Sequence, residues 1–165
     1  MTATEGTKMT VRSKFSDQVL VQRIRYFCDC LDEVGAGRSV NMMQEAIQEP
    51  SCGTPGCHAG WAYIALGGWA CQERRLFQDG IEVLSKFLGF DYNHNDLTAY
   101  CQLAEWATPQ IWGNDIGRHM FSSPSAFLFL KCPFPVEVIS SHWRKVADRV
   151  ESMSQTRSVL WSTGD

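Results

Sequence analysis

The sequence lacks an apolar run long enough to cross a membrane as a helix. A spanning helix needs roughly 18–20 consecutive apolar residues, and no stretch of this 165-residue chain approaches that length. The opening residues, Met-Thr-Ala-Thr-Glu-Gly, lead into a polar segment, so the apolar core of a signal peptide is missing as well. The sequence therefore predicts a soluble protein with a cytoplasmic location and no membrane partner.

A strong charge of either sign is also missing. The chain has 15 basic and 18 acidic residues, a formal net charge of -3, and basic residues spread along its length. Surfaces that bind nucleic acid or heparin usually show as a dense basic run, and none is present. The sequence thus indicates no nucleic-acid partner, and it leaves an unknown protein partner or self-association as alternatives.

Familiar catalytic and cofactor motifs are absent too. The sequence contains no His-Glu-x-x-His metal motif, no Gly-x-Ser-x-Gly nucleophile turn, and no glycine loop for a phosphate or a dinucleotide. No cofactor is predicted, and whether the protein is an enzyme stays open. The histidines stand apart from one another, at His58, His94, His119 and His142.

Alternating runs typical of β-strands are nearly absent, and apolar residues instead recur every three or four positions. This spacing puts side chains on one face of a helix. It predicts an all-α fold, a single-domain array of about six to eight helices, several of them short. The two clearest apolar faces are Leu20, Ile24, Phe27, Leu31 and Val34, and Ile139, Trp143, Val146, Val150 and Met153.

Glycine and proline predict where these helices begin and end. Residues 35–37, Gly-Ala-Gly, end the first helix because glycine accepts the left-handed conformation after a last turn. Residues 67–68, Gly-Gly, end a helix that runs to about residue 66, and Gly89 follows a helix over 79–88. Pro135 suits the first position of the last helix, where a missing N–H costs nothing.

Polar composition at both ends predicts flexible tails at 1–13 and 154–165, on either side of one helical domain at 14–153. Within that domain, caps and prolines indicate several further short helices. They are expected at about 95–106, 108–112, 114–121 and 123–130, and a helical turn or two is expected at 69–77. Residues 39–49 are ambiguous, although their apolar residues suit a short helix. Aromatic residues in the domain predict a large aromatic core, with a ligand pocket as the alternative. Trp61, Trp69, Trp106, Trp112, Trp143, Phe87, Phe90, Phe121, Phe127 and Phe129 belong to this set.

Seven cysteines is a high number for a chain of this kind. The number is odd and no secretion signal accompanies it, so reduced and mostly buried thiols are expected rather than a disulfide framework. The cysteines are Cys28, Cys30, Cys52, Cys57, Cys71, Cys101 and Cys132.

Cys52 and Cys57 belong to the densest motif of the chain, Cys-Gly-Thr-Pro-Gly-Cys-His-Ala-Gly-Trp at 52–61. Thr54 followed by Pro55 predicts a helix start, because threonine caps free amides and proline suits the first helical position. Cys57 then lies in the positive field of the helix start, which favours a thiolate. One hypothesis is therefore a redox or acyl-transfer protein that uses Cys57 as its nucleophile, with Cys52 as the resolving thiol.

An architectural interpretation of the motif competes with this chemistry. Gly56 and Gly60 lie four residues apart, so they form a flat stripe that lets another helix approach, and Trp61 can fill the core. A weaker alternative is a structural zinc site made by Cys52, Cys57 and His58, perhaps joined by Cys28 and Cys30. The spacings of these cysteines differ from the usual pairs of zinc ligands. We favour a non-enzymatic helical binding or interaction domain.

The pattern Cys-Gly-Thr-x-x-Cys-x-Ala-Gly-Trp at 52–61 resembles a motif that recurs in small uncharacterised bacterial and bacteriophage proteins. Leu88-Gly89-Phe90 and Trp106 resemble a later helix end and tryptophan segment in those proteins, so the resemblance covers about residues 50–125. No activity is established for the group, and none is implied for this chain. His58 departs from the pattern, because that position is expected to be apolar.

Overall fold

The structure is a computed structural model. It describes residues 12–40, 58–74, 77, 80–90, 102–103, 106–107 and 134–163. These residues are mostly helical, which confirms the predicted all-α class. The helices are α2 (Asp17–Val34), α4 (His58–Ala65), α5 (Gly67–Gln72), α6 (Gly80–Leu88) and α9 (Glu137–Thr163). Two short strands, β1 (Ser39–Val40) and β2 (Phe134–Pro135), complete the described elements.

The predicted number of six to eight helices stays a prediction. The described residues contain five helices, and most of the short ones expected from the sequence lie outside them. Residues 39–40 begin the segment 39–49, which the sequence left ambiguous, and they form β1. Within the helix expected at 95–106, only 102–103 and 106 are described, and these are helical.

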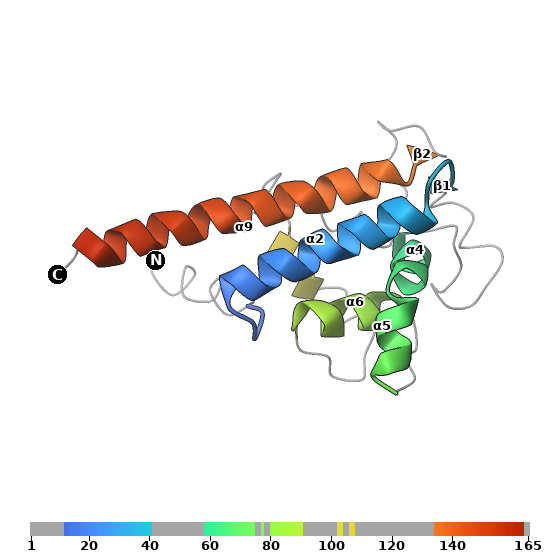
Figure 1. Ribbon diagram of the computed structural model, residues 1–165, viewed down its shortest axis with the longest axis horizontal. Coiled ribbons are helices and arrows are strands. Elements are labelled where there is room, and N and C mark those ends of the chain that lie inside the picture. The colour runs from blue at the N-terminus through green and yellow to red at the C-terminus, as the bar shows by residue number, and fades with distance from the viewer. Residues whose placement is uncertain are drawn as a thin grey trace.

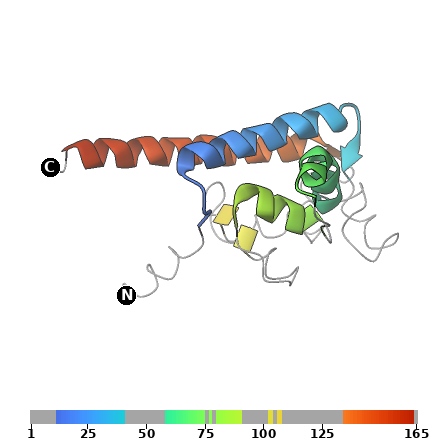
Figure 2. The same ribbon diagram turned by 60° about the horizontal axis from the view of Figure 1, so that its bottom comes forward.

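Helices α2 and α9 lie side by side in opposite directions and make the most extensive contact between elements (Figure 1). One end of this pair is closed by the strands, in which Ser39 is opposite Pro135 and Val40 is opposite Phe134. In Figure 2 the short helices α4 and α6 lie on one side of the α2–α9 pair. The described part of the chain thus has two layers, a long antiparallel pair and a set of short helices beneath it.

Helix α2 matches the sequence prediction closely. Ser16 is its N-cap, and its hydroxyl accepts a hydrogen bond from the backbone N–H of Val19 at 3.3 Å. Of the predicted apolar face, Val34 is half-buried and the other members are fully buried. The buried members are Leu20, Ile24, Phe27 and Leu31, which Val21 and Cys28 join.

The predicted face of α9 is confirmed as well, but both predicted ends of the helix are wrong. Ile139, Trp143, Val146 and Val150 are all buried, and Met153 is half-buried. Helix α9 continues to Thr163, beyond the domain boundary predicted at 153, since no glycine or proline interrupts residues 154–163.

Pro135 belongs to β2 rather than to the first turn of α9. It pairs with Ser39, and the next residue continues the pairing through a hydrogen bond from the Val136 N–H to the Arg38 carbonyl at 3.1 Å. The helix begins only at Glu137. Proline suits this short extended segment because it donates no hydrogen bond of its own.

The glycines of the first helix end have two different roles. Gly35 is the C-cap of α2 with a φ of -99°, so the left-handed residue is Gly37, at φ +70°. Gly35 is needed for space, since a Cβ there would lie 2.4 Å from Cγ1 of Val136. Gly89 follows α6 at φ +83°, as predicted for a residue after a helix end.

Helix α4 ends at Ala65, which confirms the predicted end near residue 66, and Gly67 is the first residue of the next helix, α5. The chain bends at Leu66, but hydrogen bonds continue through the bend. The Leu66 N–H donates to the Ala62 carbonyl at 3.0 Å, and the Ala70 N–H donates to the Leu66 carbonyl at 2.9 Å. Two glycines therefore stand at the start of a helix here.

The end of the predicted N-terminal tail is attached to α6. The Ser13 hydroxyl donates a hydrogen bond to the Leu88 carbonyl at 2.6 Å, and the Lys14 N–H donates to the Gly89 carbonyl at 2.8 Å. Both interactions occupy carbonyls at the C-terminal end of α6, which lack partners within the helix. Residues 1–11 of the predicted tail lie outside the described residues.

Trp143 occupies the centre of the core and is fully buried. Its ring meets Phe27 of α2 edge-on at 6.1 Å and stacks on Trp106 at 6.5 Å between centroids. Predicted aromatic packing is therefore present between α2, α9 and the segment around Trp106. Among the described helices, none combines the length and the apolar character that a membrane span requires.

Candidate functional site

The structure describes only the last part of the cysteine motif. His58, Gly60 and Trp61 lie at the start of α4, and all three are buried. The proposed thiols Cys52 and Cys57 lie outside the described residues, as do Thr54, Pro55 and Gly56. The predicted helix start, thiol pair and glycine stripe are therefore untested, and they stay predictions.

His58 is a buried hydrogen-bond acceptor. Its Nε2 atom accepts from the Trp143 indole N–H at 3.1 Å, which joins α4 to α9. Because Nε2 accepts, the proton of the neutral ring is on Nδ1. Burial lowers the pKa of His58 to about 3, so the ring is neutral at physiological pH.

The hydrogen bond from Trp143 limits how His58 could bind zinc at the proposed site. The Trp143 hydrogen bond occupies the Nε2 lone pair with which His58 would bind zinc through that atom. Within the described ranges, no three residues of the His, Cys, Asp and Glu types lie together as metal ligands would.

His142 is the second buried histidine, and it lies next to Trp143 on α9. Its ring meets the Trp143 ring edge-on at 5.5 Å. Burial lowers the pKa of His142 to about 3, and the nearby His58 and Lys145 add to the decrease. Two histidines that are neutral when folded therefore flank the central tryptophan.

The described cysteines differ in their surroundings. Cys28 is buried between α2 and α9, where its thiol donates to the Ser140 carbonyl at 3.4 Å and burial raises its pKa to about 12. Cys30 is half-buried, and burial again raises the pKa of its thiol. Cys71 is exposed on α5. Burial therefore disfavours a thiolate at Cys28 and at Cys30.

Alkylation of the folded protein with iodoacetamide should therefore follow exposure. We expect Cys71 to react first, Cys30 more slowly, and Cys28 only after unfolding, because alkylation requires an accessible thiolate. Peptide mapping by mass spectrometry measures all seven thiols in the same experiment. Rapid labelling of Cys28 at neutral pH would show that the α2–α9 interface opens readily.

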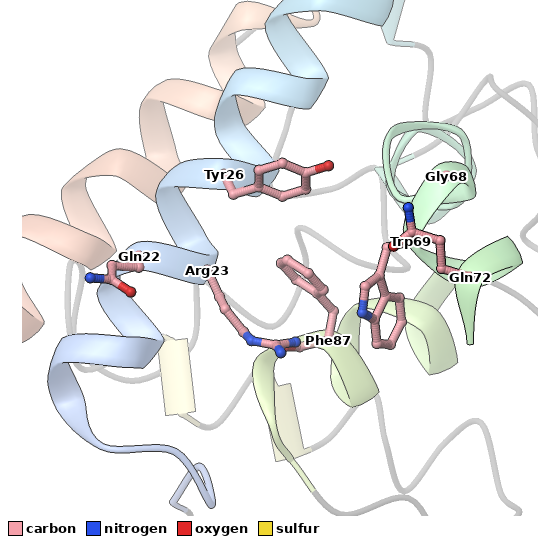
Figure 3. Close-up of a pocket in the computed structure, with 7 residues that line it drawn as sticks. All are labelled: Gln22, Arg23, Tyr26, Gly68, Trp69, Gln72 and Phe87. Atoms are coloured by element: carbon pink, nitrogen blue, oxygen red, sulfur yellow. The ribbon is translucent and has the colours of Figure 1, made fainter.

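An open pocket of about 380 Å³ lies between α2, α5 and α6 (Figure 3). This volume is within the range of small-ligand pockets. We call it the aromatic groove. It is lined by Gln22, Arg23, Tyr26, Gly68, Trp69, Gln72 and Phe87.

Three aromatic rings form the apolar wall of the groove, with Phe87 between the other two (Figure 3). The Phe87 ring is 5.8 Å from Tyr26 and 5.1 Å from Trp69, which it meets edge-on. Trp69 also stacks on Phe77, with 5.7 Å between the ring centroids. Tyr26 is 52% exposed although it is a large aromatic residue, so its ring is available to a ligand.

The side chain of Cys30 affects the titration of the Tyr26 hydroxyl. A hydrogen bond between the Tyr26 and Cys30 side chains, one turn apart on α2, raises the pKa of Tyr26.

Arg23 forms the polar end of the groove. Its guanidinium carbon lies 4.4 Å from the centroid of the Phe15 ring and 4.8 Å from that of Phe87. Its Nη1 donates to the Phe87 carbonyl at 2.8 Å, near the end of α6. Two cation–π contacts and a hydrogen bond thus fix the position of one positive charge beside the aromatic wall.

The sequence could not reveal how these residues come together. Trp69 and Phe87 belong to the aromatic set for which a ligand pocket was the alternative to core packing, and they do line a pocket. Arg23 and Tyr26 were missed, because they lie on the polar side of α2, away from its periodic apolar face. An exposed aromatic next to an arginine was the one signal available.

Comparison with protein-family models, curated protein sequences and solved structures finds no match to this chain.

Proposed function

We propose that this protein is a helical binding domain that holds a segment of a partner protein in the aromatic groove. The observation that carries the proposal is the exposed Tyr26 ring beside Trp69, Phe87 and Arg23 in one pocket. Tyrosine, tryptophan and arginine dominate the binding energy of protein interfaces. The preferred interpretation from the sequence, a non-enzymatic interaction domain, thus has a specific candidate surface.

The construction of the groove supports a binding role. Its walls come from three helices, which hold their side chains more rigidly than loops do. Its mouth is open, since Gln22, Gly68 and Gln72 are exposed at the surface. An open, aromatic-lined groove suits a side chain presented by another chain better than a substrate that must be shielded from water.

Peptides selected from a displayed random library against the folded protein provide a test. We expect Tyr26→Ala to weaken binding of the selected peptides about tenfold or more, as for a residue at the centre of an interface. Val19→Ala is the matched control, since Val19 is another exposed apolar residue of α2 and does not line the groove. Binding can be measured by fluorescence anisotropy of labelled peptides.

Two outcomes would contradict the groove as the binding surface. In one, selected peptides keep their affinity for the Tyr26→Ala variant, and in the other the library yields no binder. Equal losses in the Tyr26→Ala and Val19→Ala variants would also contradict it, because they would place the contact on the general α2 surface.

The alternatives based on the cysteine motif stay hypotheses. A redox or acyl-transfer role requires Cys57 to react faster than Cys71 in the alkylation experiment, at a pH well below 8. A zinc-binding structural module requires stoichiometric zinc in protein purified without added metal. Self-association is the alternative to a separate partner, and sedimentation of the purified protein distinguishes them.

A further inference from the structure

Building on the proposed groove function, we infer that the bound segment presents a carboxylate beside an aromatic ring, and that Arg23 recognises the carboxylate. Failure of this inference would leave the groove itself in place. The inference concerns the chemical class of the ligand. Three observations support it: the position and charge of Arg23, the shape of the aromatic wall, and the lack of acidic residues in the lining.

The guanidinium of Arg23 carries its hydrogen-bond donors around its rim. Phe15 and Phe87 lie against it at 4.4 and 4.8 Å from their ring centroids, which leaves hydrogen bonding to the N–H groups around its rim. The Phe87 carbonyl takes a hydrogen bond from Nη1. Of the five N–H donors of an arginine, most therefore remain for a carboxylate, which can accept two of them in parallel.

Arg23 differs in its charge balance from the other arginines that contact α2 or belong to it. Arg25 pairs with Asp148 and Glu151 at 3.1 and 2.9 Å. Arg144 of α9 likewise pairs with two acids of α2, Asp29 and Asp32. Within the described part of the chain, Arg23 has no such ion pair, and the seven lining residues include one cation and no acid. The groove therefore favours an anionic group over an ammonium group.

The remaining walls suit a flat ring next to that anion. Tyr26 and Trp69 stand on either side of Phe87, so a ring that enters the groove can meet aromatic edges and faces. Gly68 adds no side chain, and a Cβ built there meets nothing within 4 Å. The volume of about 380 Å³ has room for an indole ring with a short acidic arm.

Three probes that share an indole ring and differ in charge test the inference. They are indole-3-acetate, indole-3-acetamide and tryptamine, titrated into isotope-labelled protein and followed through the Gly68 amide and the Trp69 indole signals. We expect the acetate to bind about fivefold more tightly than the acetamide, with tryptamine weakest. Added salt should reduce the preference for the acetate, because the charges meet at a partly exposed site.

Variants of two arginines on the same helix locate the effect. Arg23→Gln should bring the affinity for the acetate down to that for the acetamide, whereas Arg25→Gln should leave the preference unchanged, since Arg25 is paired outside the groove. Arg23→Lys keeps the charge but loses the planar pair of donors, so part of the preference should remain. Thermal unfolding of each variant confirms that it is folded.

Equal binding of the acetate and the acetamide to the wild-type protein would overturn the inference, and it would leave the aromatic groove as a binding surface. An acetate preference that survives Arg23→Gln would also overturn it. If none of the probes moves the Gly68 or Trp69 signals, the inference is again overturned, while the peptide selection separately decides whether the groove binds a partner.

Discussion

Lowering the pH from 7 to 5 is expected to reduce the free energy of unfolding by about 4 kcal/mol, because two buried histidines must stay neutral in the folded protein. His58 and His142 both have pKa values of about 3 in the fold, well below the usual 6.5. The unfolded chain takes up a proton on each ring below pH 6.5, and the folded chain does not. Each pH unit in this window then costs about 1.4 kcal/mol per histidine.

The sign of the effect follows from the direction of the pKa shifts. A base whose folded pKa is lowered binds fewer protons when folded, so acid favours the unfolded state between pH 6.5 and 3. The associated stability is fully present above pH 6.5 and is lost as the pH falls. Asp32 acts in the same direction at lower pH, because hydrogen bonds from Ser140 and Arg144 outweigh burial and lower the pKa of its carboxyl.

Urea unfolding at pH 7, 6 and 5 measures the loss directly. His142→Leu should roughly halve the slope of stability against pH, because it removes one of the two protons taken up on unfolding. Val146→Ala is the control, since it creates a cavity on the same helix without changing the number of titrating groups. It should lower stability at every pH and leave the slope unchanged. A wild-type stability that is constant from pH 7 to 5 would show that the histidines are not held neutral.

The long helices were predictable because their signal is local. In α2 and α9 the apolar residues repeat every three or four positions, and helical geometry alone puts them on one face. Their partners were not predictable in the same way. The Trp143 indole meets His58 from 85 residues away in the sequence, and no local pattern marks a histidine as the acceptor for that indole.

Helix boundaries failed where tertiary contacts decide the backbone. Pro135 has the right chemistry for a first helical position, yet pairing with Ser39 holds it in a strand. Residues 67–68 follow the end of α4 at Ala65 as predicted, yet hydrogen bonds continue through Leu66 and Gly67 begins α5. In both cases the local preference is worth about 1 kcal/mol or less, which packing readily overrides.

The candidate site depends even more on the packing of elements. Its rings and its arginine come from α2, α5 and α6, which are separated in the chain, and only their packing turns an exposed tyrosine into one wall of a groove. The cysteine motif stands out in the sequence because its residues are adjacent. The residues of the groove, such as Arg23, Tyr26 and Trp69, share no sequence pattern and come together only when the helices pack.

Replacing Gly80 with alanine is expected to destabilise the protein by about 3 kcal/mol, at the upper end of what overpacking usually costs. Gly80 is the first residue of α6, and a Cβ there would lie only 1.7 Å from the Ala59 carbonyl oxygen and 2.5 Å from the carbonyl carbon. The obstacle is backbone of α4, which cannot move aside as a flexible side chain can. The glycine that permits this close approach lies on α6, whereas the glycine stripe predicted at Gly56 and Gly60 stays a prediction.

The steric clash, rather than helix propensity, decides whether Gly80→Ala raises or lowers the free energy of unfolding. Alanine in place of a helical glycine would by itself gain up to about 1 kcal/mol. A shift large enough to relieve the clash would separate α6 from α4 along their contact, where Ala59 and Val83 are fully buried. The loss of that packing exceeds the gain in helix propensity, so the net effect is destabilising.

Gly67→Ala is the matched control for this experiment. Gly67 also stands at the first position of a helix, but a Cβ there meets nothing within 4 Å. We expect this variant to be as stable as the wild-type protein or slightly more stable, since only the propensity term remains. Chemical unfolding of the two variants side by side separates steric contact from backbone preference. If Gly80→Ala proved as stable as Gly67→Ala, helices α4 and α6 would not pack backbone to backbone, and the short-helix layer beneath α2 and α9 would have to be arranged differently.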